Sequence, residues 1–201
     1  MKVEIIAFTP NPEKLIEEAA RVCYDSFDKQ SLTSHVRIID HLIRSGHESV
    51  LEHASVTYRV GGVSRALTHQ LVRHRLASYS QRSQRYVKET EPDYVMPPSI
   101  QSMETNATAI HIFNNCMEQC WIAYNKLLKM GIKGEDARFV LPNACCSEII
   151  ITMNFRELRH FFKLRTSKHA QWEIRNMAKE MWNQVMKIGA ANVFGDIRFE
   201  E

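Results

Sequence analysis

Acidic residues are missing from one long stretch of the chain. The sequence contains no Asp or Glu between His53 and Lys88, whereas seven Lys or Arg residues fall there. Because nothing neutralises these cations locally, the stretch should carry a strong positive potential, which disfavours cationic ligands and suits a polyanion or several phosphates. Most of the cations are Arg, whose planar guanidinium binds phosphate oxygens through paired hydrogen bonds.

Long apolar runs are also absent. The chain has no run of about 18 apolar residues, so we expect no membrane-spanning helix and no membrane partner. Residues 1–14 contain only a short apolar run with an acid inside it, which is typical of a β-strand rather than of a signal peptide. We therefore expect a cytoplasmic protein.

The sequence lacks several common metal and cofactor motifs. It contains no HExxH pattern, no matching pair of Cys-x2-Cys motifs, no GxGxxG motif and no Walker loop. These absences disfavour a zinc site, a Rossmann site and a P-loop, and we expect no metal. The five cysteines are an odd number in a chain of this size, which indicates reduced thiols rather than a disulfide framework. Cys145 and Ser83 remain weak candidates for a nucleophile, because the spacing places no His beside either of them.

The patterning of the 201 residues predicts one α+β domain. Strands and helices alternate irregularly, which favours a central, mostly antiparallel sheet flanked by helices over a βαβ series. Strands are expected at 2–8, 55–60 and 148–153. Helices are expected from Asn11 onward and at 34–44, 64–77, 105–130, 135–141, from Asn154 onward and at 170–190.

Local signals predict where these elements begin and end. Asn11 should cap a helix that has Pro12 at its first position, and Gly46 should end the helix at 34–44. Gly61 and Gly62 should end the strand at 55–60.

Helical spacing also predicts how the Arg-rich region is presented. Within the expected helix at 64–77, Gln70, Arg73, His74 and Ala77 fall three and four residues apart and should share one face. The polar, Pro-bearing residues 80–103 should form a loop.

The densest group of cations is RHRLASYSQRSQRY, residues 73–86. It could be a solvated basic face, a nucleic-acid surface or a site for phosphate-bearing small molecules. Stacking on nucleic-acid bases normally uses several exposed aromatics, and only Tyr79 and Tyr86 are available here. The residues therefore favour a small phosphate-bearing ligand and leave nucleic acid as the alternative.

Two further groups of residues suit anions. Asn154, Phe155 and Arg156 begin a helix, whose N-terminal amides attract negative charge, and His160 follows shortly after. A simple Asn cap explains this segment about equally well.

Arg138 and Arg165 lie among small or apolar residues, where a buried cation needs an anionic partner. That partner could be a ligand, or it could be an acid of the same chain. Three acids could serve in this way: Glu135, Glu157 and Glu173.

Taken together, these segments resemble the flavin-dependent thymidylate synthases. Arg73-His74-Arg75, seven further residues and then Ser83 match that family's RHR-x7-S signature. Other blocks resemble the family in the same order along nearly the whole chain: AARVCY (19–24), GHESVLEH (46–53), QLVRHR (70–75), SQRY (83–86), ARFVLP (137–142), NFREL (154–158), KLR (163–165) and HAQWEIR (169–175).

The resemblance implies a reaction and a set of ligands. Such enzymes make dTMP from dUMP, with 5,10-methylenetetrahydrofolate as carbon donor, NADPH as reductant and FAD relaying a hydride. They use no enzymic nucleophile. They are homotetramers with active sites shared between subunits. The resemblance implies no nucleic-acid partner and no membrane partner.

The resemblance also implies site residues. The positions that resemble FAD contacts are Ser49, Arg73, His74, Arg75, Gln81, Asn154, Phe155, Arg156 and His160, and His47 and Glu52 lie in a block that lines the flavin site. The positions that resemble dUMP contacts are Gln70, Leu71, Val72, Arg73, Gln81, Arg82, Ser83, Gln84, Arg85, Arg138 and Arg165. Arg165 matches the arginine thought to favour N3-deprotonated uracil, because a fixed cation stabilises that anion.

Three positions depart from the family's usual residues. Gln81 stands where members often have Glu, so its amide can hydrogen-bond but cannot exchange protons. His160 occupies a place often held by Asn, and Arg82 adds a charge to the dUMP loop. Two other readings remain: a non-catalytic nucleic-acid-binding domain, and a flavin-binding reductase without methyl transfer.

Overall fold

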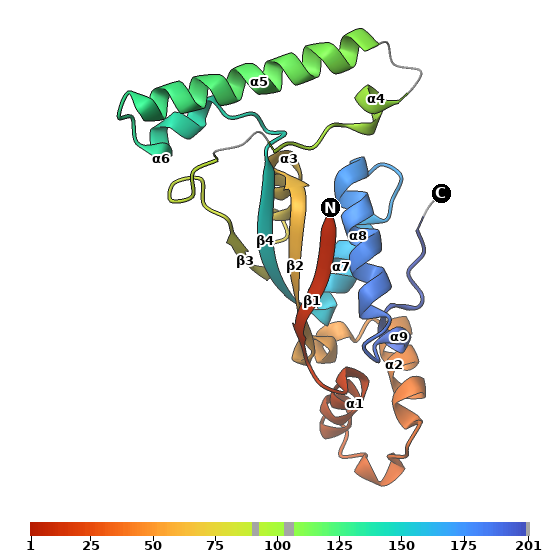
Figure 1. Cartoon of the computed structure of the whole chain (residues 1–201). Helices are drawn as coiled ribbons and strands as arrows, with labels where there is room; N and C mark the ends of the chain where they lie inside the picture. The colour runs from red at the N-terminus through yellow and green to blue at the C-terminus, as the bar shows by residue number, and fades with distance from the viewer. Residues whose placement is uncertain (90–92, 103–106, 200–201) are drawn as a thin grey trace. The chain divides into compact units, whose positions relative to one another are not determined.

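The computed structural model describes residues 1–89, 93–102 and 107–199 (Figure 1). Its elements confirm the α+β class, with a four-stranded antiparallel sheet and flanking helices. The elements are β1 (Lys2–Phe8), α1 (Pro12–Val22), η1 (Phe27–Lys29), α2 (Ser34–Arg44), η2 (Glu48–His53), β2 (Ser55–Ser64), α3 (Arg65–Leu71), β3 (Ala77–Gln81), α4 (Pro98–Gln101), α5 (Ala107–Lys129), α6 (Gly134–Ala137), η3 (Arg138–Val140), β4 (Cys146–Asn154), α7 (Phe155–Arg165), α8 (Trp172–Val185) and α9 (Ala191–Phe194), where η marks a 3-10 helix.

The chain forms two compact units. The first unit contains Met1–Val60, Leu71–Ser80 and Ile150–Glu201, and the second contains Gly61–Gln70 and Gln81–Ile149. Neither unit is one continuous segment of the sequence, because the chain passes between the units four times.

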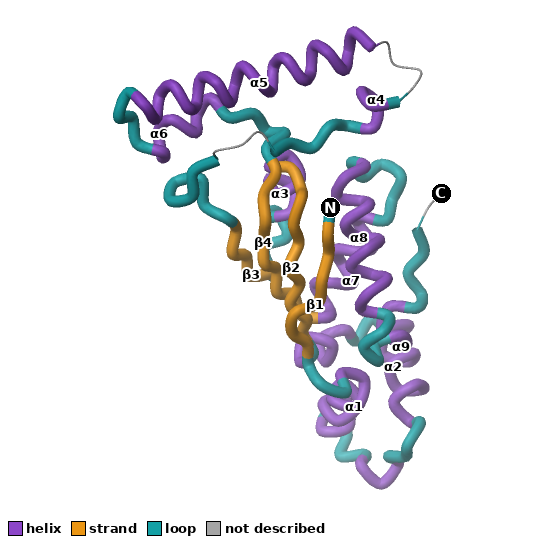
Figure 2. The backbone as a smooth tube through the Cα atoms, in the orientation of Figure 1, coloured by secondary structure: helices purple, strands orange, loops and turns teal. Residues whose placement is uncertain are grey.

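The strands follow the order β1-β2-β4-β3 (Figure 2). Val56, Tyr58 and Val60 are fully buried along β2, whereas the residues between them are more exposed, which confirms the predicted alternation. The hydroxyl groups of Thr57 and Thr152 lie 3.0 Å apart across neighbouring strands. One side of β2 therefore faces the apolar core of the first unit.

Helices cover the sheet of the first unit. In this unit α8 packs against β1, α7 packs against α8 and η2, and α1 packs against α2. The buried Tyr58 hydroxyl donates to the Met181 carbonyl at 3.1 Å, which joins β2 to α8. The buried rings of Phe155, Phe162 and Phe194 pack edge to face in the same core.

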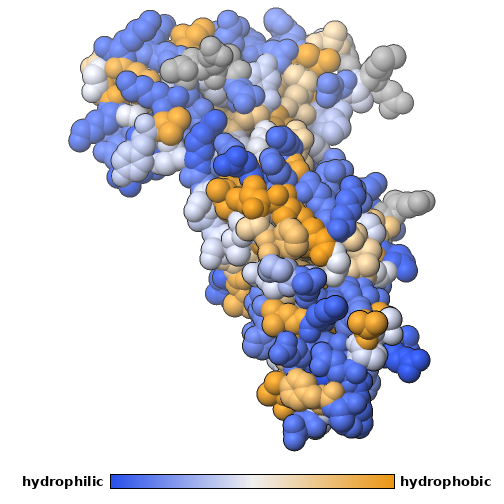
Figure 3. All heavy atoms as spheres, turned by 60° about the horizontal axis from the view of Figure 1, so that its bottom comes forward, coloured by the Kyte–Doolittle hydropathy of each residue, from blue (hydrophilic) through white to orange (hydrophobic). Residues whose placement is uncertain are grey.

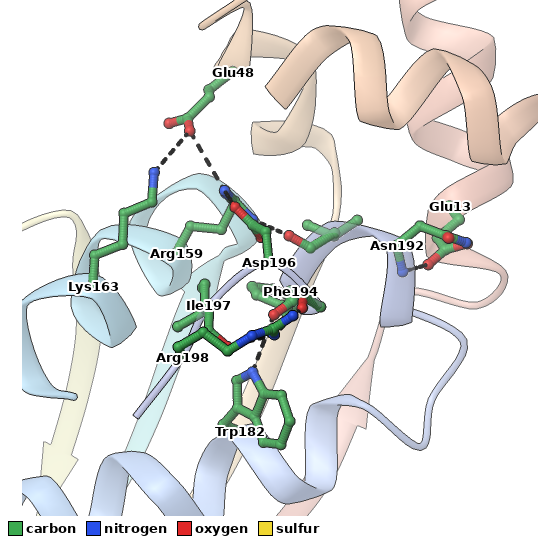
Figure 4. A network of polar contacts seen from close by, with 12 residues as sticks. Glu13, Glu48, Arg159, Lys163, Trp182, Asn192, Phe194, Asp196, Ile197 and Arg198 are labelled. Carbon is green, nitrogen blue, oxygen red and sulfur yellow. Dashed lines mark hydrogen bonds and ion pairs between the residues drawn. The ribbon is translucent and has the colours of Figure 1, made fainter. Parts of the chain in front are cut away.

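A buried arginine ties α7 to η2 and to the C-terminal segment (Figure 4). The fully buried Arg159 makes two 2.7 Å hydrogen bonds to the Asp196 carboxylate and lies 3.6 Å from Glu48. Lys163 approaches the same Glu48 oxygen at 3.4 Å. The bond to Arg159 holds the pKa of Asp196 below its usual range. Because a buried cation is tolerated only when it is paired, this network fixes η2 against α7.

Several predicted ends are confirmed. α2 spans Ser34–Arg44, and Gly46 after it has φ 72°, a left-handed conformation that glycine adopts without strain. Asn154 caps α7, because its Oδ1 accepts a 2.9 Å hydrogen bond from the Glu157 amide. Asn11 does precede Pro12 at the start of α1, but its side chain makes no capping hydrogen bond.

The prediction that Gly61 and Gly62 end a strand is wrong. β2 continues through both glycines to Ser64. Gly62 has φ 67°, so the lack of a side chain lets the strand bend without ending.

The prediction of one helix over 64–77 is also wrong. α3 ends at Leu71, and residues 77–81 pair with β4 as β3. The Tyr79 hydroxyl lies 2.9 Å from the Leu71 carbonyl and 2.8 Å from the His74 carbonyl, which holds residues 72–76 in a turn. Here the pairing of residues 77–81 with β4 outweighs the helical spacing of the sequence. Gln70, Arg73, His74 and Ala77 therefore do not share a helix face.

The remaining predicted elements differ in length. The helix expected at 170–190 is shorter, α8 at Trp172–Val185, and α9 follows it as a separate turn. The segment at 135–141 is split into α6 and η3. The loop expected at 80–103 contains the end of β3 and the short α4, and its residues 90–92 and 103 lie outside the described residues. α5 confirms the long helix from Ala107, and 105–106 lie outside as well.

The surface carries hydrophobic side chains in separate patches among hydrophilic ones, on the face that Figure 3 presents. Among the residues with described structure, none of the helices is both long and apolar enough to cross a bilayer. Over the same residues, no cluster of three or more His, Cys, Asp or Glu side chains could hold a metal ion.

Candidate functional site

Arg73, His74 and Arg75 lie in the turn that follows α3, within the first unit. Arg73 and Arg75 are exposed, whereas His74 is only 4% exposed. The turn therefore exposes the guanidinium groups of Arg73 and Arg75 to solvent, whereas the imidazole of His74 is buried inside the unit.

His74 connects two residues of α7. Its Nδ1 lies 3.2 Å from Oε1 of Glu157, near the start of the helix. Its Nε2 lies 3.1 Å from Nε of Arg165, the last residue of the helix. Arg Nε–H can only donate, so Nε2 must accept and a neutral His74 must carry its proton on Nδ1. Nδ1 then donates to Glu157.

The charges of these groups fit that arrangement. Burial, followed by the nearby Arg165 and His160, lowers the pKa of His74 to about 4, so the imidazole is neutral at neutral pH. Burial also lowers the pKa of the Arg165 guanidinium and raises the pKa of the Glu157 carboxyl. Of the three acids considered as partners for these arginines, Glu157 is joined to Arg165 through His74.

The start of α7 and η2 hold several of the predicted FAD contacts. Arg156 is exposed and donates to Glu52 of η2 at 2.5 Å. His160 is exposed one turn farther along α7, and its ring centroid lies 5.8 Å from that of His74. Ser49 is exposed on η2. These side chains are accessible donors at a helix N-terminus, an arrangement that suits an anion.

Phe155 and Asn154 are less available than predicted. The Phe155 side chain is fully buried, and its amide donates to the Ala54 carbonyl at 2.9 Å. The Oδ1 of Asn154 accepts the capping hydrogen bond of α7, so its Nδ2 is the side-chain group that could donate to a ligand.

Gln81 and Arg82 lie in the second unit and have partners within the protein. Gln81 Nε2 donates to Thr68 Oγ1 at 3.1 Å and to Ser147 Oγ at 2.9 Å. Arg82 pairs with Glu89 at 3.1 Å and reaches the Cys146 carbonyl at 3.3 Å. Both hydrogen bonds of Gln81 use its amide nitrogen, and among the described residues no donor contacts its side-chain oxygen.

Ser83 and Arg85 form a tight turn in the second unit. Ser83 Oγ accepts from the Arg85 amide at 3.2 Å. The Arg85 guanidinium lies 3.1 Å from Glu135 and 5.4 Å from the ring centroid of Tyr86. The surface position of this ion pair makes it weak, so an incoming phosphate could displace Glu135.

A polar pocket of about 270 Å³ lies in the second unit. Arg65, Gln84 and Arg138 line it. Gln84 is 6% exposed, and its buried Nε2 has no hydrogen-bond partner among residues 1–89, 93–102 and 107–199. Arg138 Nε donates to the Glu135 carbonyl at 3.1 Å. Two guanidinium groups and an unused amide donor suit an anion with several oxygens.

Sequence reasoning gave Arg65 no role in a site. The available signal was its place in the acid-free stretch, but seven cations shared that signal. Burial, and next the charge of Arg138, lower the pKa of the Arg65 guanidinium. The structure therefore singles out Arg65 because a second cation lies close to it.

The predicted site residues are divided between the two units. The first unit contains Ser49, Leu71, Val72, Arg73, His74, Arg75, Asn154, Phe155, Arg156, His160 and Arg165. The second unit contains Gln70, Gln81, Arg82, Ser83, Gln84, Arg85 and Arg138. Leu71 is buried and Val72 is exposed, so only Val72 can offer its side chain to a ligand from the surface.

Neither candidate nucleophile has a base beside it. Burial raises the pKa of the Cys145 thiol to about 12, so it stays protonated and unreactive at neutral pH. Among the described residues, no His side chain makes a hydrogen bond to Cys145 or to the Ser83 hydroxyl.

Comparison with known proteins gives a consistent result. The chain matches the family described as "Thymidylate synthase complementing protein" over residues 4–189. The flavin-dependent thymidylate synthase of Geobacter sulfurreducens is 46% identical, over 98% of this chain and 86% of its own length. That of Clostridium tetani is 43% identical, over 96% of this chain and 85% of its own length.

Solved structures show the same fold. The UMP/dUMP methylase PolB from Streptomyces cacaoi, bound with 5-Br dUMP, has a TM-score of 0.84 at 27% identity, and the match covers 96% of this chain and 92% of PolB. ThyX from Helicobacter pylori, solved with FAD and dUMP, has a TM-score of 0.77 at 23% identity and covers 98% of both chains. On the family match and the relatives' identities, the chain belongs to the flavin-dependent thymidylate synthase family.

Proposed function

We propose that this protein converts dUMP to dTMP, using 5,10-methylenetetrahydrofolate as carbon donor and NADPH as reductant. The observation that carries the proposal is the hydrogen bond from Arg165 Nε to the neutral imidazole of His74. It lies in a chain that matches the family over residues 4–189. When bound, FAD supplies the hydride that reaches the uracil ring. The protein's own residues would bind, orient and polarise the ligands.

The residues of the first unit fit FAD. Arg73, Arg75 and Arg156 are exposed cations, and α7 offers a helix N-terminus, so the diphosphate of FAD would meet several donors. His160 and Ser49 add exposed hydrogen-bonding groups. Glu52 already neutralises part of Arg156, and a bound diphosphate would compete with it for the guanidinium.

The residues of the second unit suit the phosphate of dUMP. The pocket lined by Arg65, Gln84 and Arg138 offers two cations and an amide donor to a dianion. Ser83 and Arg85 in the neighbouring turn are further donors once Arg85 leaves Glu135. Binding the dianion would also relieve the repulsion between Arg65 and Arg138, which favours phosphate over a neutral ligand.

Arg165 is proposed to act on the uracil ring. A guanidinium beside N3 stabilises the N3 anion, which enriches the ring in electrons and prepares it to accept a hydride. The half-buried position of Arg165 strengthens this effect, because charges interact more strongly away from bulk water. The high pKa of Cys145 agrees with a route without an enzymic nucleophile.

We further propose a homotetramer with shared active sites, as the family resemblance implies. A chain of 201 residues has to bind FAD, dUMP and the other large anionic ligands. Neighbouring subunits that form part of each active site would supply the contacts that one chain lacks.

The test is release of tritium from dUMP labelled at C5 of the uracil. We expect release that requires FAD, NADPH and methylenetetrahydrofolate together, with dTMP as product. Flavin reduction by NADPH without dTMP formation would instead favour a reductase. A protein that stays colourless after incubation with FAD would favour a basic nucleic-acid-binding domain.

A further inference from the structure

Glu157 lies outside the residues assigned to FAD or dUMP, yet it contacts one of them inside the first unit. Its side chain is 6% exposed, and Oε1 lies 3.2 Å from Nδ1 of His74. We propose that Glu157 is a positioning residue for Arg165: it holds His74 in the Nδ1–H tautomer, and the bare Nε2 then holds Arg165 by its Nε. This assignment deepens the proposed function and rests on it for its kinetic consequences.

The tautomer of His74 decides whether its side chain can hydrogen-bond to both Glu157 and Arg165, which lie near the two ends of α7. His74 with its proton on Nε2 would direct that proton at the Nε–H of Arg165, and the two donors would repel each other. An acceptor at Nδ1 is therefore needed to stabilise the tautomer that can receive Arg165. Glu157 Oε1 is that acceptor, and His74 is 4% exposed, which limits the water that could replace it.

The positions of the three residues are well fixed. Asn154 caps the first turn of α7 by accepting from the Glu157 amide at 2.9 Å, so the backbone that carries Glu157 is anchored independently of its side chain. His74 packs edge to face on Phe161, with ring centroids 4.9 Å apart. Tyr79 donates to the His74 carbonyl at 2.8 Å, which holds the turn that delivers the imidazole. The imidazole therefore has little freedom except exchange of its proton between nitrogens.

The contact through Nε matters for what Arg165 can offer. His74 engages Arg165 through Nε, so the imidazole restrains the orientation of the guanidinium plane. A planar fork recognises a uracil edge only when its plane is fixed, so the direction of the fork depends on His74 and in turn on Glu157.

The first experiment reads the tautomer without any reaction. The holoenzyme is labelled with 15N-histidine, and the His74 resonances, assigned with His74→Asn, report which ring nitrogen carries the proton at pH 7. We expect Nδ1–H in the wild type and in Glu157→Gln, whose amide oxygen can still accept. We expect Glu157→Leu to populate the Nε2–H tautomer. Glu13→Leu is the matched control, because Glu13 is also a buried first-turn glutamate, at the start of α1.

The second experiment measures tritium release in a double-mutant cycle. Glu157→Leu should lower kcat by roughly 10- to 100-fold, the usual weight of a hydrogen bond that places a charged group. The same change made in Arg165→Ala should have almost no further effect, because there is no guanidinium left to position. Glu157→Gln should retain most of the activity. A merely structural role for Glu157 would instead add its loss to that of Arg165→Ala.

The outcomes separate the inference from the proposed function. An unchanged His74 tautomer in Glu157→Leu, or additive losses in the cycle, would overturn the positioning role while wild-type turnover kept the function intact. A wild type that bound FAD but released no tritium would overturn the function, and the NMR comparison would still decide the tautomer. Should Glu157→Leu fail to fold, Glu157→Met removes the same acceptor with an unbranched chain, and the same two readouts apply.

Discussion

Arg165 in the first unit and the pair of Arg65 and Arg138 in the second differ in the partners that the protein gives them. In the first unit, Arg165 is held by His74, which is held by Glu157, so the polar groups are paired before any ligand arrives. In the second unit, Arg65 and Arg138 line one pocket with the unused Nε2 of Gln84. The first arrangement is preorganised for chemistry, and the second gains its missing partner on binding. Changes in the first should therefore act on turnover, and changes in the second on affinity.

The largest expected effect comes from removing the preorganised cation. Arg165→Ala should lower tritium release by about 100- to 1000-fold, the usual loss when one group that stabilises transition-state charge is removed. Affinity for FAD should change little by comparison. The control is Lys179→Ala, which removes an exposed cation from α8 of the same unit. Loss of FAD binding with normal turnover per bound flavin would break the contrast between the units.

The pairing in the first unit should also depend on pH. The pKa of His74 falls from 6.5 to about 4 on folding, so the unfolded chain takes up a proton at higher pH than the folded one. The free energy of unfolding should therefore fall as pH drops from about 6.5 to about 4, by up to ~3 kcal/mol. Glu157 works in the other direction, because burial raises its pKa.

Denaturant unfolding at a series of pH values measures this effect. His74→Asn should flatten the stability curve between those pH values, whereas His41→Asn, at an exposed histidine of α2, should not. An equally steep curve in His74→Asn would place the titrating group elsewhere.

In the second unit, removing a cation should cost affinity for the phosphate. Arg65→Leu and Arg138→Leu should each weaken dUMP binding by roughly 10- to 100-fold, as expected for charge-assisted hydrogen bonds. Both variants should bind deoxyuridine, which has no phosphate, as well as the wild type does. Calorimetry with the two ligands gives the ratio, with Lys129→Met at the end of α5 as a charge-matched control. A parallel loss of deoxyuridine binding would show damage to the pocket rather than a lost phosphate contact.

The smallest expected effect concerns an exposed pair. Arg156 and Glu52 lie 2.5 Å apart at the surface of the first unit, where water screens their attraction. Glu52→Gln should leave the melting temperature almost unchanged. FAD affinity should stay equal or rise by less than ~5-fold, because the diphosphate no longer competes with a carboxylate. A marked fall in FAD affinity, measured by flavin fluorescence, would give Glu52 a direct role in binding.

Sequence patterns predicted the elements whose signals are local. The alternation along Val56, Tyr58 and Val60 requires only that one face of a strand be buried. Asn154 and Gly46 mark helix ends through their own hydrogen bonding and backbone freedom. The helix predicted over 64–77 failed because β3 gains its stability from a strand distant in sequence.

By itself, the sequence determined the family, the α+β class and the concentration of cations from His53 to Lys88. These follow from residue identity and order, which folding does not change. The tertiary structure alone decided that His74 lies between Glu157 and Arg165, and that Arg65 lines a pocket with Arg138. A pKa, a tautomer and a pocket depend on which groups meet in space, and here the partners are up to 91 residues apart in the sequence. The Arg-rich stretch is thus one feature of the sequence that the fold divides into two chemically different places.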